Sequence, residues 1–226
     1  MKQHLILVAG GTGTRMQQPV AKQFILLKGR PLMWWTLQRF RDALGDDLEV
    51  VLVLHKSLVH EFHELEKRHG PAGVSQVVHG GVERWHSVFN GLDSLPDSGV
   101  VGIHDAVRPF VAVATIRDCY ETARASGSAV PVVPVKDSIR EVHGAGSHAV
   151  TRDGLRAVQT PQCFDIQMLK GAYGSGYREE FTDDASVFEY AGYPIHLVKG
   201  DHQNIKITTP EDLLIARAFV EGFTQD

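Results

Sequence analysis

The feature that most constrains this chain is a glycine-rich turn that directly follows an apolar run near the N-terminus. The run Leu5–Ala9 is followed by the closely spaced glycines Gly10, Gly11 and Gly13. Because glycine has no Cβ atom, the backbone N–H groups of such a turn are open to an anion. Arg15 and Lys22 add cations just beyond the turn. The segment therefore predicts a strand that leads into a phosphate-binding loop.

The spacing of these glycines excludes two common phosphate-binding motifs. A P-loop requires Lys-Ser or Lys-Thr after its last glycine, and neither pair follows here. The dinucleotide fingerprint G-x-G-x-x-G fails because Met16 occupies the position of its third glycine. An ordinary strand-to-helix turn that uses glycine for positive φ is the alternative interpretation.

Length, composition and charge bound the class of protein. With 226 residues the chain suits one large α/β domain, and we expect a single domain over residues 1–226. Hydrophobic residues make up 43% of the chain, yet no apolar run approaches the ~20 residues that span a bilayer. The net charge of -4 argues against nucleic-acid binding, which requires an excess of Lys and Arg. We therefore expect no membrane and no nucleic acid among the partners.

Cysteine usage and the first residues indicate the compartment. Cys119 and Cys163 show no C-x-x-C spacing, which favours two buried thiols without a disulfide in a reducing compartment. An apolar run that begins at Leu5 leaves no room for the regions of a secretory signal. We expect a cytoplasmic protein.

Apolar strands and amphipathic helices alternate along the first half of the chain. The first helical face is marked by Met33, Leu37, Phe40 and Leu44. Beyond it we expect strands at 49–55, 74–79 and 100–103, and helices at 57–69 and 83–95. Such alternation predicts an α/β fold with a mostly parallel twisted sheet and helices on both faces. Ligands then bind outside the carboxyl ends of the strands.

The pattern changes between residues 136 and 159. Two strand-like segments, 138–143 and 148–158, flank the small-residue turn 144–147. They predict a protruding β-hairpin arm. Because a lone hairpin is at best marginally stable in water, we expect the arm to pack on a second subunit. A mobile surface hairpin is the alternative.

The last third returns to alternating helices and strands. Thr182 is expected to cap a helix that runs through Gly192, and a strand is expected at 195–198. Thr209, followed by Pro210 at the first helical position, is a typical N-cap and predicts the start of a terminal helix.

Three segments at strand ends carry side chains that suit nucleotide chemistry. Asp105 follows an apolar strand, where its carboxylate suits Mg²⁺ beside a phosphate; an aspartate that caps the next turn is the alternative. Gly81 and Ser87 flank a helix start and suit the polar edge of a base. Lys206 is a candidate only if it converges with the first loop, because isolated lysines usually lie on the surface.

Histidine is frequent but scattered. Of the 12 histidines, only His60 and His63 have a helical spacing that permits a shared metal. Their segment is polar, so a solvated helix face is the better interpretation.

Seven motifs in order along the chain resemble one enzyme family. They are Ala-Gly-Gly-x-Gly-x-Arg-Met, Pro-x-x-Lys-Gln, Gly-Gly-x-Glu-Arg-x-x-Ser-Val, His-Asp-Ala-x-Arg-Pro, Thr-Pro-Gln, Thr-Asp-Asp-Ala-Ser and Asn-Ile-Lys-Ile-Thr-x-Pro-Glu-Asp. They span nearly the whole chain, which is similar to the 2-C-methyl-D-erythritol 4-phosphate cytidylyltransferases and to their close relatives, the ribitol-5-phosphate cytidylyltransferases. Gly10 stands where many members have alanine, and Ser138 replaces the usual threonine.

The resemblance implies a Rossmann-like nucleotidyltransferase fold, a homodimer formed through the hairpin arm, and Mg²⁺ or another divalent cation as cofactor. It implies transfer of CMP from CTP to 2-C-methyl-D-erythritol 4-phosphate with release of pyrophosphate, a step of non-mevalonate isoprenoid synthesis. Val107 also occurs in the ribitol-phosphate relatives, so D-ribitol 5-phosphate is the alternative acceptor. A non-catalytic nucleotide-binding domain is the second alternative.

The resemblance also implies a role for each matching residue. The catalytic cations are expected to be Arg15, Lys22 and Lys206. The nucleotide-binding residues are expected to be Ala9, Gly10, Gly11, Gly13, Gly81, Ser87 and Ala106. The acceptor side is expected to include Asp105, Arg108, Ser138, Arg152 and Thr182, with Arg152 supplied by the other subunit. Asp105 also matches the metal-binding aspartate.

Overall fold

The computed structural model describes residues 2–11 and 20–223, with the last three of these described by their backbone alone. The strands of the main sheet are β1 (Gln3–Ala9), β4 (Glu49–Leu54), β5 (Gln76–His79), β6 (Val100–Asp105), β7 (Ser128–Pro134), β10 (Arg156–Val158), β11 (Gln162–Asp165) and β12 (Leu197–Lys199). The helices are α1 (Leu32–Leu44), α2 (Val59–His69), α3 (Arg84–Asp93), α4 (Val113–Ser126), α5 (Ile166–Tyr173), α6 (Asp184–Tyr190) and α7 (Pro210–Phe223). Short 3₁₀ turns lie at Lys22–Phe24 (η2) and Lys56–Leu58 (η3), and Leu26–Leu27 (β2) pairs with Arg30–Pro31 (β3).

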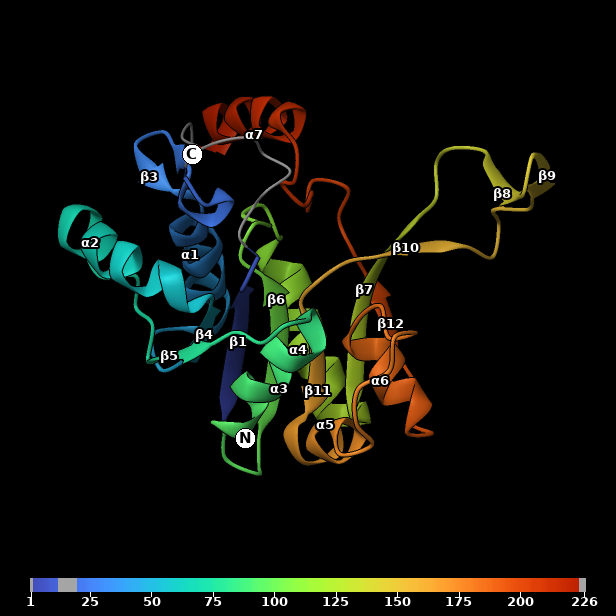
Figure 1. Cartoon of the computed structure of the whole chain (residues 1–226), viewed down its shortest axis with the longest axis horizontal. Coiled ribbons are helices and arrows are strands. Elements are labelled where there is room, and N and C mark those ends of the chain that lie inside the picture. Colours follow the sequence, from blue (N-terminus) through green and yellow to red (C-terminus); the bar gives the residue numbers. More distant parts are fainter. Residues whose placement is uncertain (1, 12–19, 224–226) are drawn as a thin grey trace.

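The main sheet is mostly parallel. Its strand order is β10-β7-β11-β6-β1-β4-β5, with β12 beside β7 (Figure 1). β1 pairs in parallel with both β4 and β6, and β5 and β12 extend this direction. Among the described residues, only β10 and β11 run antiparallel to their neighbours in this sheet. The predicted α/β architecture is confirmed.

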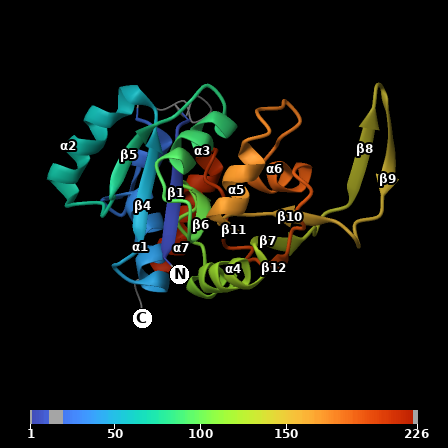
Figure 2. The same cartoon turned by 90° about the horizontal axis from the view of Figure 1, so that it is seen from below.

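Helices cover both faces of the sheet because side chains alternate along its strands. On β1, Leu5 and Leu7 belong to the apolar core under α1, α2 and α4, whereas Ile6 belongs to the core under α3, α5 and α6. All three side chains are fully buried. Figure 2 shows the two helix layers on opposite sides of the strands. This period of two is what a strand between two apolar layers requires.

The chain reverses its direction of sheet building at β1. From β1 it moves to β4 and β5 on one side, and then crosses to β6 on the other side. A crevice therefore opens between the carboxyl ends of β1 and β6, the position where open α/β sheets bind ligands. Gly10 and Gly11 follow β1 directly, and Asp105 is the last residue of β6.

A smaller apolar cluster holds α7 against the body of the molecule. Leu213, Ala216 and Val220 of α7 pack with Leu27 of β2 and with Ile207, which precedes the helix. Thr209 Oγ1 accepts the N–H of Asp212, and Asp212 accepts that of Thr209 in return, which confirms the predicted helix start. Packing of α7 thus fixes the position of the segment that contains Lys206.

The hairpin stands away from the body of the molecule (Figures 1 and 2). Its strands β8 (Ile139–His143) and β9 (Gly146–Val150) form a two-stranded antiparallel sheet of their own. The register joins His143 to Gly146, so Gly144 and Ala145 form the loop, and Gly144 has φ of +57°. A two-residue loop with glycine at a positive φ matches the twist of a hairpin.

Two sequence-based expectations in this half are wrong in detail. The strand expected at 148–158 is two separate strands: β9 ends at Val150, and β10 belongs to the main sheet. β11 pairs only with Ser128 and Ala129 at the start of β7, so the end of β7 is free to pair with β10. Asp183, not Thr182, caps α6: its carboxylate accepts the N–H of Ser186, whose hydroxyl accepts the N–H of Asp183.

Cys119 and Cys163 are free thiols in the buried core. None of the helices in the described ranges combines the length and hydropathy that a bilayer crossing requires.

Candidate active site

A cavity of about 410 Å³ lies at the carboxyl ends of β1 and β6. The sequence-predicted site residues that line it are Ala9, Gly10, Gly11, Lys22, Gly81, Ser87, Asp105 and Lys206. They come from segments far apart in the chain. Lys206 therefore converges with the first glycine loop, as its candidacy requires, and its functional role stays a prediction.

The glycine loop and Lys22 are held together by a buried side chain. Gln23, which is 1% exposed, donates from Nε2 to the carbonyl oxygen of Ala9 at 3.0 Å. This bond ties the turn η2 to the end of β1. Lys22 is the first residue of η2 and thus lines the cavity beside Gly10 and Gly11. Gly13 and Arg15 lie outside the described residues.

The opposite wall is formed by the loop that leads into α3. The N–H of Gly81 donates to Ser87 Oγ at 3.1 Å. A Cβ atom at position 81 would lie 2.3 Å from the Cβ of His86, so this close approach requires glycine. Val82, next along the loop, is 92% exposed and adds no polar group. The polar surface here comes from backbone groups and from Ser87.

Asp105 lies at the centre of a group of cations. Its Oδ2 is 3.1 Å from Lys206 Nζ and 3.1 Å from Arg108 Nε. Burial alone raises the pKa of this carboxyl, but the positive charges of Lys206, Arg84 and Arg108 outweigh burial and hold its pKa well below the usual range. Asp105 is therefore ionised at neutral pH, as a ligand of a hard cation must be.

Buried hydrogen bonds place Lys206 beside β6. Asn204 is fully buried; its Nδ2 donates to the carbonyl of Thr160 at 2.8 Å, and its carbonyl accepts from Arg108 Nη1 at 2.7 Å. Three residues after Asn204, the N–H of Ile207 donates to the carbonyl of Val107 at 3.0 Å. These bonds anchor both sides of Lys206 to the loop that follows Asp105.

His104 supports Asp105 from within the core. Its Nε2 lies 3.2 Å from the carbonyl oxygen of Arg108, which only accepts, so Nε2 carries the proton. Nδ1 then accepts from the hydroxyl of Thr160 at 2.9 Å, and the Thr160 oxygen accepts the N–H of Asp105 at 3.3 Å. Complete burial lowers the pKa of His104 to about 4. The neutral ring thus fixes the end of β6.

A second cavity of about 300 Å³ adjoins the first and shares Arg84, Asp105 and Lys206 with it. Arg108 and Thr182 line this second cavity. Their predicted contact with the acceptor stays a prediction.

Arg84 is the main residue that the sequence did not single out. It borders both cavities, and its Nη1 and Nη2 donate to the two carboxylate oxygens of Asp184 at 3.0 and 2.6 Å. The Tyr173 hydroxyl also donates to Asp184, at 2.7 Å. Burial alone lowers the pKa of Arg84, but Asp184 more than compensates and raises it. Arg84 and Asp184 each belong to one of the seven family motifs, but only the fold shows that their side chains pair.

The remaining predicted site residues lie elsewhere. Ala106 is buried directly behind the cavity, where its N–H donates to Val8 and its carbonyl accepts from Thr36. Ser138 and Arg152 lie on the hairpin and line neither cavity, and the Arg152 guanidinium contacts the carbonyl of Lys136. Within one chain, the structure thus does not bring them to the site.

The donor set at the cavity fits a magnesium ion. One carboxylate, Asp105, faces a cavity rich in cations, and Mg²⁺ commonly uses one or two carboxylates together with substrate phosphates. In the described part of the chain, the one cluster of three metal-ligating side chains lies on the hairpin, at Glu141, His143 and His148. His60 and His63 are exposed on α2, as the solvated-face interpretation predicted.

Comparison with known proteins agrees with this geometry. The sequence profile of the family IspD: 2-C-methyl-D-erythritol 4-phosphate cytidylyltransferase matches residues 3–222. The chain belongs to this family. It is similar to the enzyme of that name from Bacteroides thetaiotaomicron, with 45% identity over 97% of this chain and 100% of the relative. The one from Porphyromonas gingivalis is 41% identical over 96% of each chain.

Solved structures agree as well. The crystal structure of the 4-diphosphocytidyl-2C-methyl-D-erythritol synthase from Anaerococcus prevotii superposes with a TM-score of 0.82 at 27% identity, over 97% of this chain and 96% of that chain. The Thermus thermophilus cytidylyltransferase superposes with a TM-score of 0.78 at 34% identity, over 98% and 100%. The chain is thus a nucleotidyltransferase that transfers CMP from CTP to 2-C-methyl-D-erythritol 4-phosphate in isoprenoid synthesis.

Proposed function

We propose that the larger cavity binds CTP and the adjoining cavity binds the acceptor, so that the α-phosphorus of CTP lies between them at Lys206. The observation that carries this assignment is the convergence of Lys22, Arg84 and Lys206 with Asp105 around one space. The glycine loop after β1 supplies backbone N–H groups for the triphosphate. Gly81 and Ser87 bind the cytosine and ribose, and Ala106 supports this wall from behind.

The reaction requires positioning and charge neutralisation rather than proton transfer. An oxygen of the acceptor phosphate attacks the α-phosphorus in line, the bond between the α-phosphorus and its bridging oxygen breaks, and pyrophosphate leaves. The acceptor phosphate is already a nucleophile, so no general base is needed. Lys206 and Arg15 stabilise the growing charge on the α-phosphate, and Lys22 stabilises the departing pyrophosphate.

A divalent cation completes the site. Asp105 is the residue that would hold it, and the ion would neutralise phosphate charge that the lysines leave uncompensated. Arg108 orients Asp105 through its ion pair of 3.1 Å and faces the acceptor cavity together with Thr182. The free, buried thiols suit a reducing compartment, and we place the enzyme in the cytoplasm.

We further propose a homodimer in which the hairpin arm of one subunit reaches the active site of the other. Val142 on this hairpin is 71% exposed, and the two hairpin strands pair only with each other among the described residues. A hairpin of this kind is marginally stable alone and gains from a covering partner. Arg152 and Ser138 would then contact the acceptor across the interface.

Turnover with CTP tests the assignment of the acceptor. Pyrophosphate release is measured with 2-C-methyl-D-erythritol 4-phosphate and with D-ribitol 5-phosphate, and is repeated with ATP and UTP. The proposal predicts release with CTP and the methylerythritol acceptor. Preferential turnover of ribitol phosphate would reassign the acceptor cavity, and equal use of ATP would contradict the cytosine-binding role of Gly81 and Ser87.

Subunit mixing tests the reach of Arg152. Lys206→Ala and Arg152→Ala chains are inactive separately if both residues act. In co-expressed mixtures, action across the interface restores about a quarter of the parental turnover, because half of the dimers are mixed and each mixed dimer has one intact site. If Arg152 acts within its own chain, no mixed site is intact and activity stays at the level of the single variants.

A further inference from the structure

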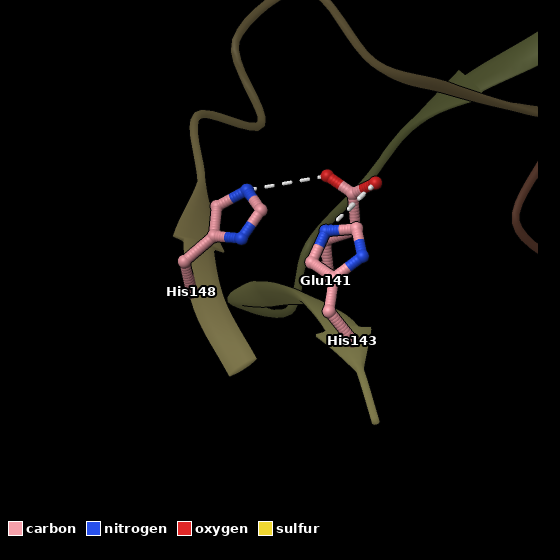
Figure 3. Close-up of side chains that lie close together, drawn as sticks. All are labelled: Glu141, His143 and His148. Atoms are coloured by element: carbon pink, nitrogen blue, oxygen red, sulfur yellow. Dashed lines mark ion pairs between the residues drawn. The ribbon is translucent and has the colours of Figure 1, made fainter. Parts of the chain in front are cut away.

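The hairpin arm carries a cluster of metal-ligating side chains that the CMP-transfer reaction does not use. Glu141 and His143 lie two residues apart on β8, and His148 on β9 is the register partner of Glu141. Side chains two apart on a strand, and those of a directly opposed pair, share one face of the sheet. Figure 3 shows the three side chains close together, with a dashed line from each imidazole to the Glu141 carboxylate.

The distances within the cluster suit a shared ion. Glu141 Oε1 is 3.3 Å from His143 Nε2, and Oε2 is 3.2 Å from His148 Nε2. One ligand atom from each residue lies within 4.8 Å of the others. Bond lengths of about 2.0–2.1 Å to zinc separate tetrahedral ligand atoms by roughly 3.3 Å. The two imidazole rings are stacked, with centroids 5.2 Å apart and planes parallel to within 7°.

We propose that Glu141, His143 and His148 form a binding site for a transition-metal cation of the zinc class. Two neutral imidazoles and one carboxylate are the donor set of borderline cations, whereas Mg²⁺ favours oxygen ligands alone. All three side chains are exposed, so water or a group from a second molecule fills the fourth position. The site is separate from Asp105 in both its position and its chemistry.

The opposite face of the hairpin carries a different cross-strand contact. Arg140 Nε donates to Ser147 Oγ at 2.8 Å, and this pair already crosslinks β8 and β9 there. A bound cation would join the same two strands on the other face through His143 and His148. It would therefore stiffen an arm that has few apolar contacts of its own.

Direct zinc binding tests the site. Tag-free protein is titrated with Zn²⁺ against a chromophoric chelator, in the presence of millimolar Mg²⁺. The proposal predicts one competing site per chain that is removed or weakened at least about tenfold in Glu141→Gln, His143→Ala and His148→Ala separately. The matched control is His60→Ala with His63→Ala, an exposed histidine pair on α2, which should leave this site unchanged.

The outcomes separate the site from general histidine binding. Equal loss of affinity in the His60/His63 control, or binding that survives all three hairpin substitutions, would overturn the proposal. Absence of competing zinc binding in the parental protein would overturn it as well. Turnover with CTP and Mg²⁺ at the parental rate shows that each variant is folded, so a lost site is not a misfolded one.

Discussion

Lys206 Nζ lies 3.1 Å from Asp105 Oδ2, although one residue belongs to the segment before α7 and the other ends β6. The Lys206 side chain is 41% exposed and that of Asp105 is 10% exposed. The ammonium group therefore borders both the carboxylate and the open cavity. This arrangement places a partly exposed cation and a buried anion side by side where the proposed reaction needs a phosphate and a metal ion.

Replacement of Asp105 tests its proposed metal role. Asp105→Asn removes the charge that would bind Mg²⁺, and the Mg²⁺ concentration for half-maximal turnover should rise at least about tenfold. Asp118→Asn, an exposed aspartate on α4, is the matched control. A variant with lower turnover but an unchanged Mg²⁺ dependence would show that Asp105 only pairs with its neighbouring cations.

The pair Arg84–Asp184 should stabilise the fold as well as the site. Asp184 is fully buried and Arg84 is 30% exposed at the side chain. Arg84→Ala leaves the carboxylate without its cation and should lower the free energy of unfolding by about 3 kcal/mol, the lower end of the range for buried pairs. Arg84→Lys keeps the charge but loses one of two hydrogen bonds, so its loss should be smaller. Urea unfolding measures the free energy of unfolding of both variants. A loss below about 0.5 kcal/mol in Arg84→Ala would show that the Arg84–Asp184 pair does not stabilise the fold.

The stability of the protein should fall in mild acid because of His104. Its pKa is lowered from 6.5 to about 4 in the folded state, so the unfolded chain binds a proton first as the pH falls. The contribution of neutral His104 is complete above pH 6.5 and is lost as the pH falls toward 4. His4, whose pKa is also lowered by burial, acts in the same direction.

Unfolding at several pH values isolates the part of His104. His104→Gln removes the titrating group and should reduce the slope of the unfolding free energy against pH by up to about 1.4 kcal/mol per pH unit in that window. The same slope in variant and parent between pH 6.5 and 4 would mean that His104 is not kept neutral by the fold.

Local pattern was enough to predict most of the scaffold. Apolar strands and amphipathic helices alternate along the chain through β6, and this pattern predicts a sheet with helices on both faces. The structure has this sheet: Leu5 and Leu7 are buried under one helix layer and Ile6 under the other. The sequence predicts the cap at Thr209 because threonine followed by proline is strongly biased toward helix starts. Thr182 failed as a cap because Asp183, an equally good capping residue, lies next to it.

Contacts between residues far apart in the sequence are the part of the site that local patterns do not predict. The motifs supplied Lys22, Asp105 and Lys206 as candidates, and the fold brings them to one cavity. No local pattern pairs Arg84 with Asp184, which lie 100 residues apart. The sequence alone does not reveal the hairpin cluster for a similar reason, because His148 meets Glu141 only through the strand register.

The measurement that most directly tests the account is single-turnover CMP transfer by Lys206→Ala, with CTP binding measured in parallel. Removal of one preorganised cation from the α-phosphate should slow the chemical step about 10²–10³-fold, while the protein still folds and binds CTP. Lys199→Ala, an exposed lysine on β12, should keep the parental rate. A Lys206→Ala protein that transfers CMP at the parental rate would contradict the claim that this lysine stabilises the reacting phosphate.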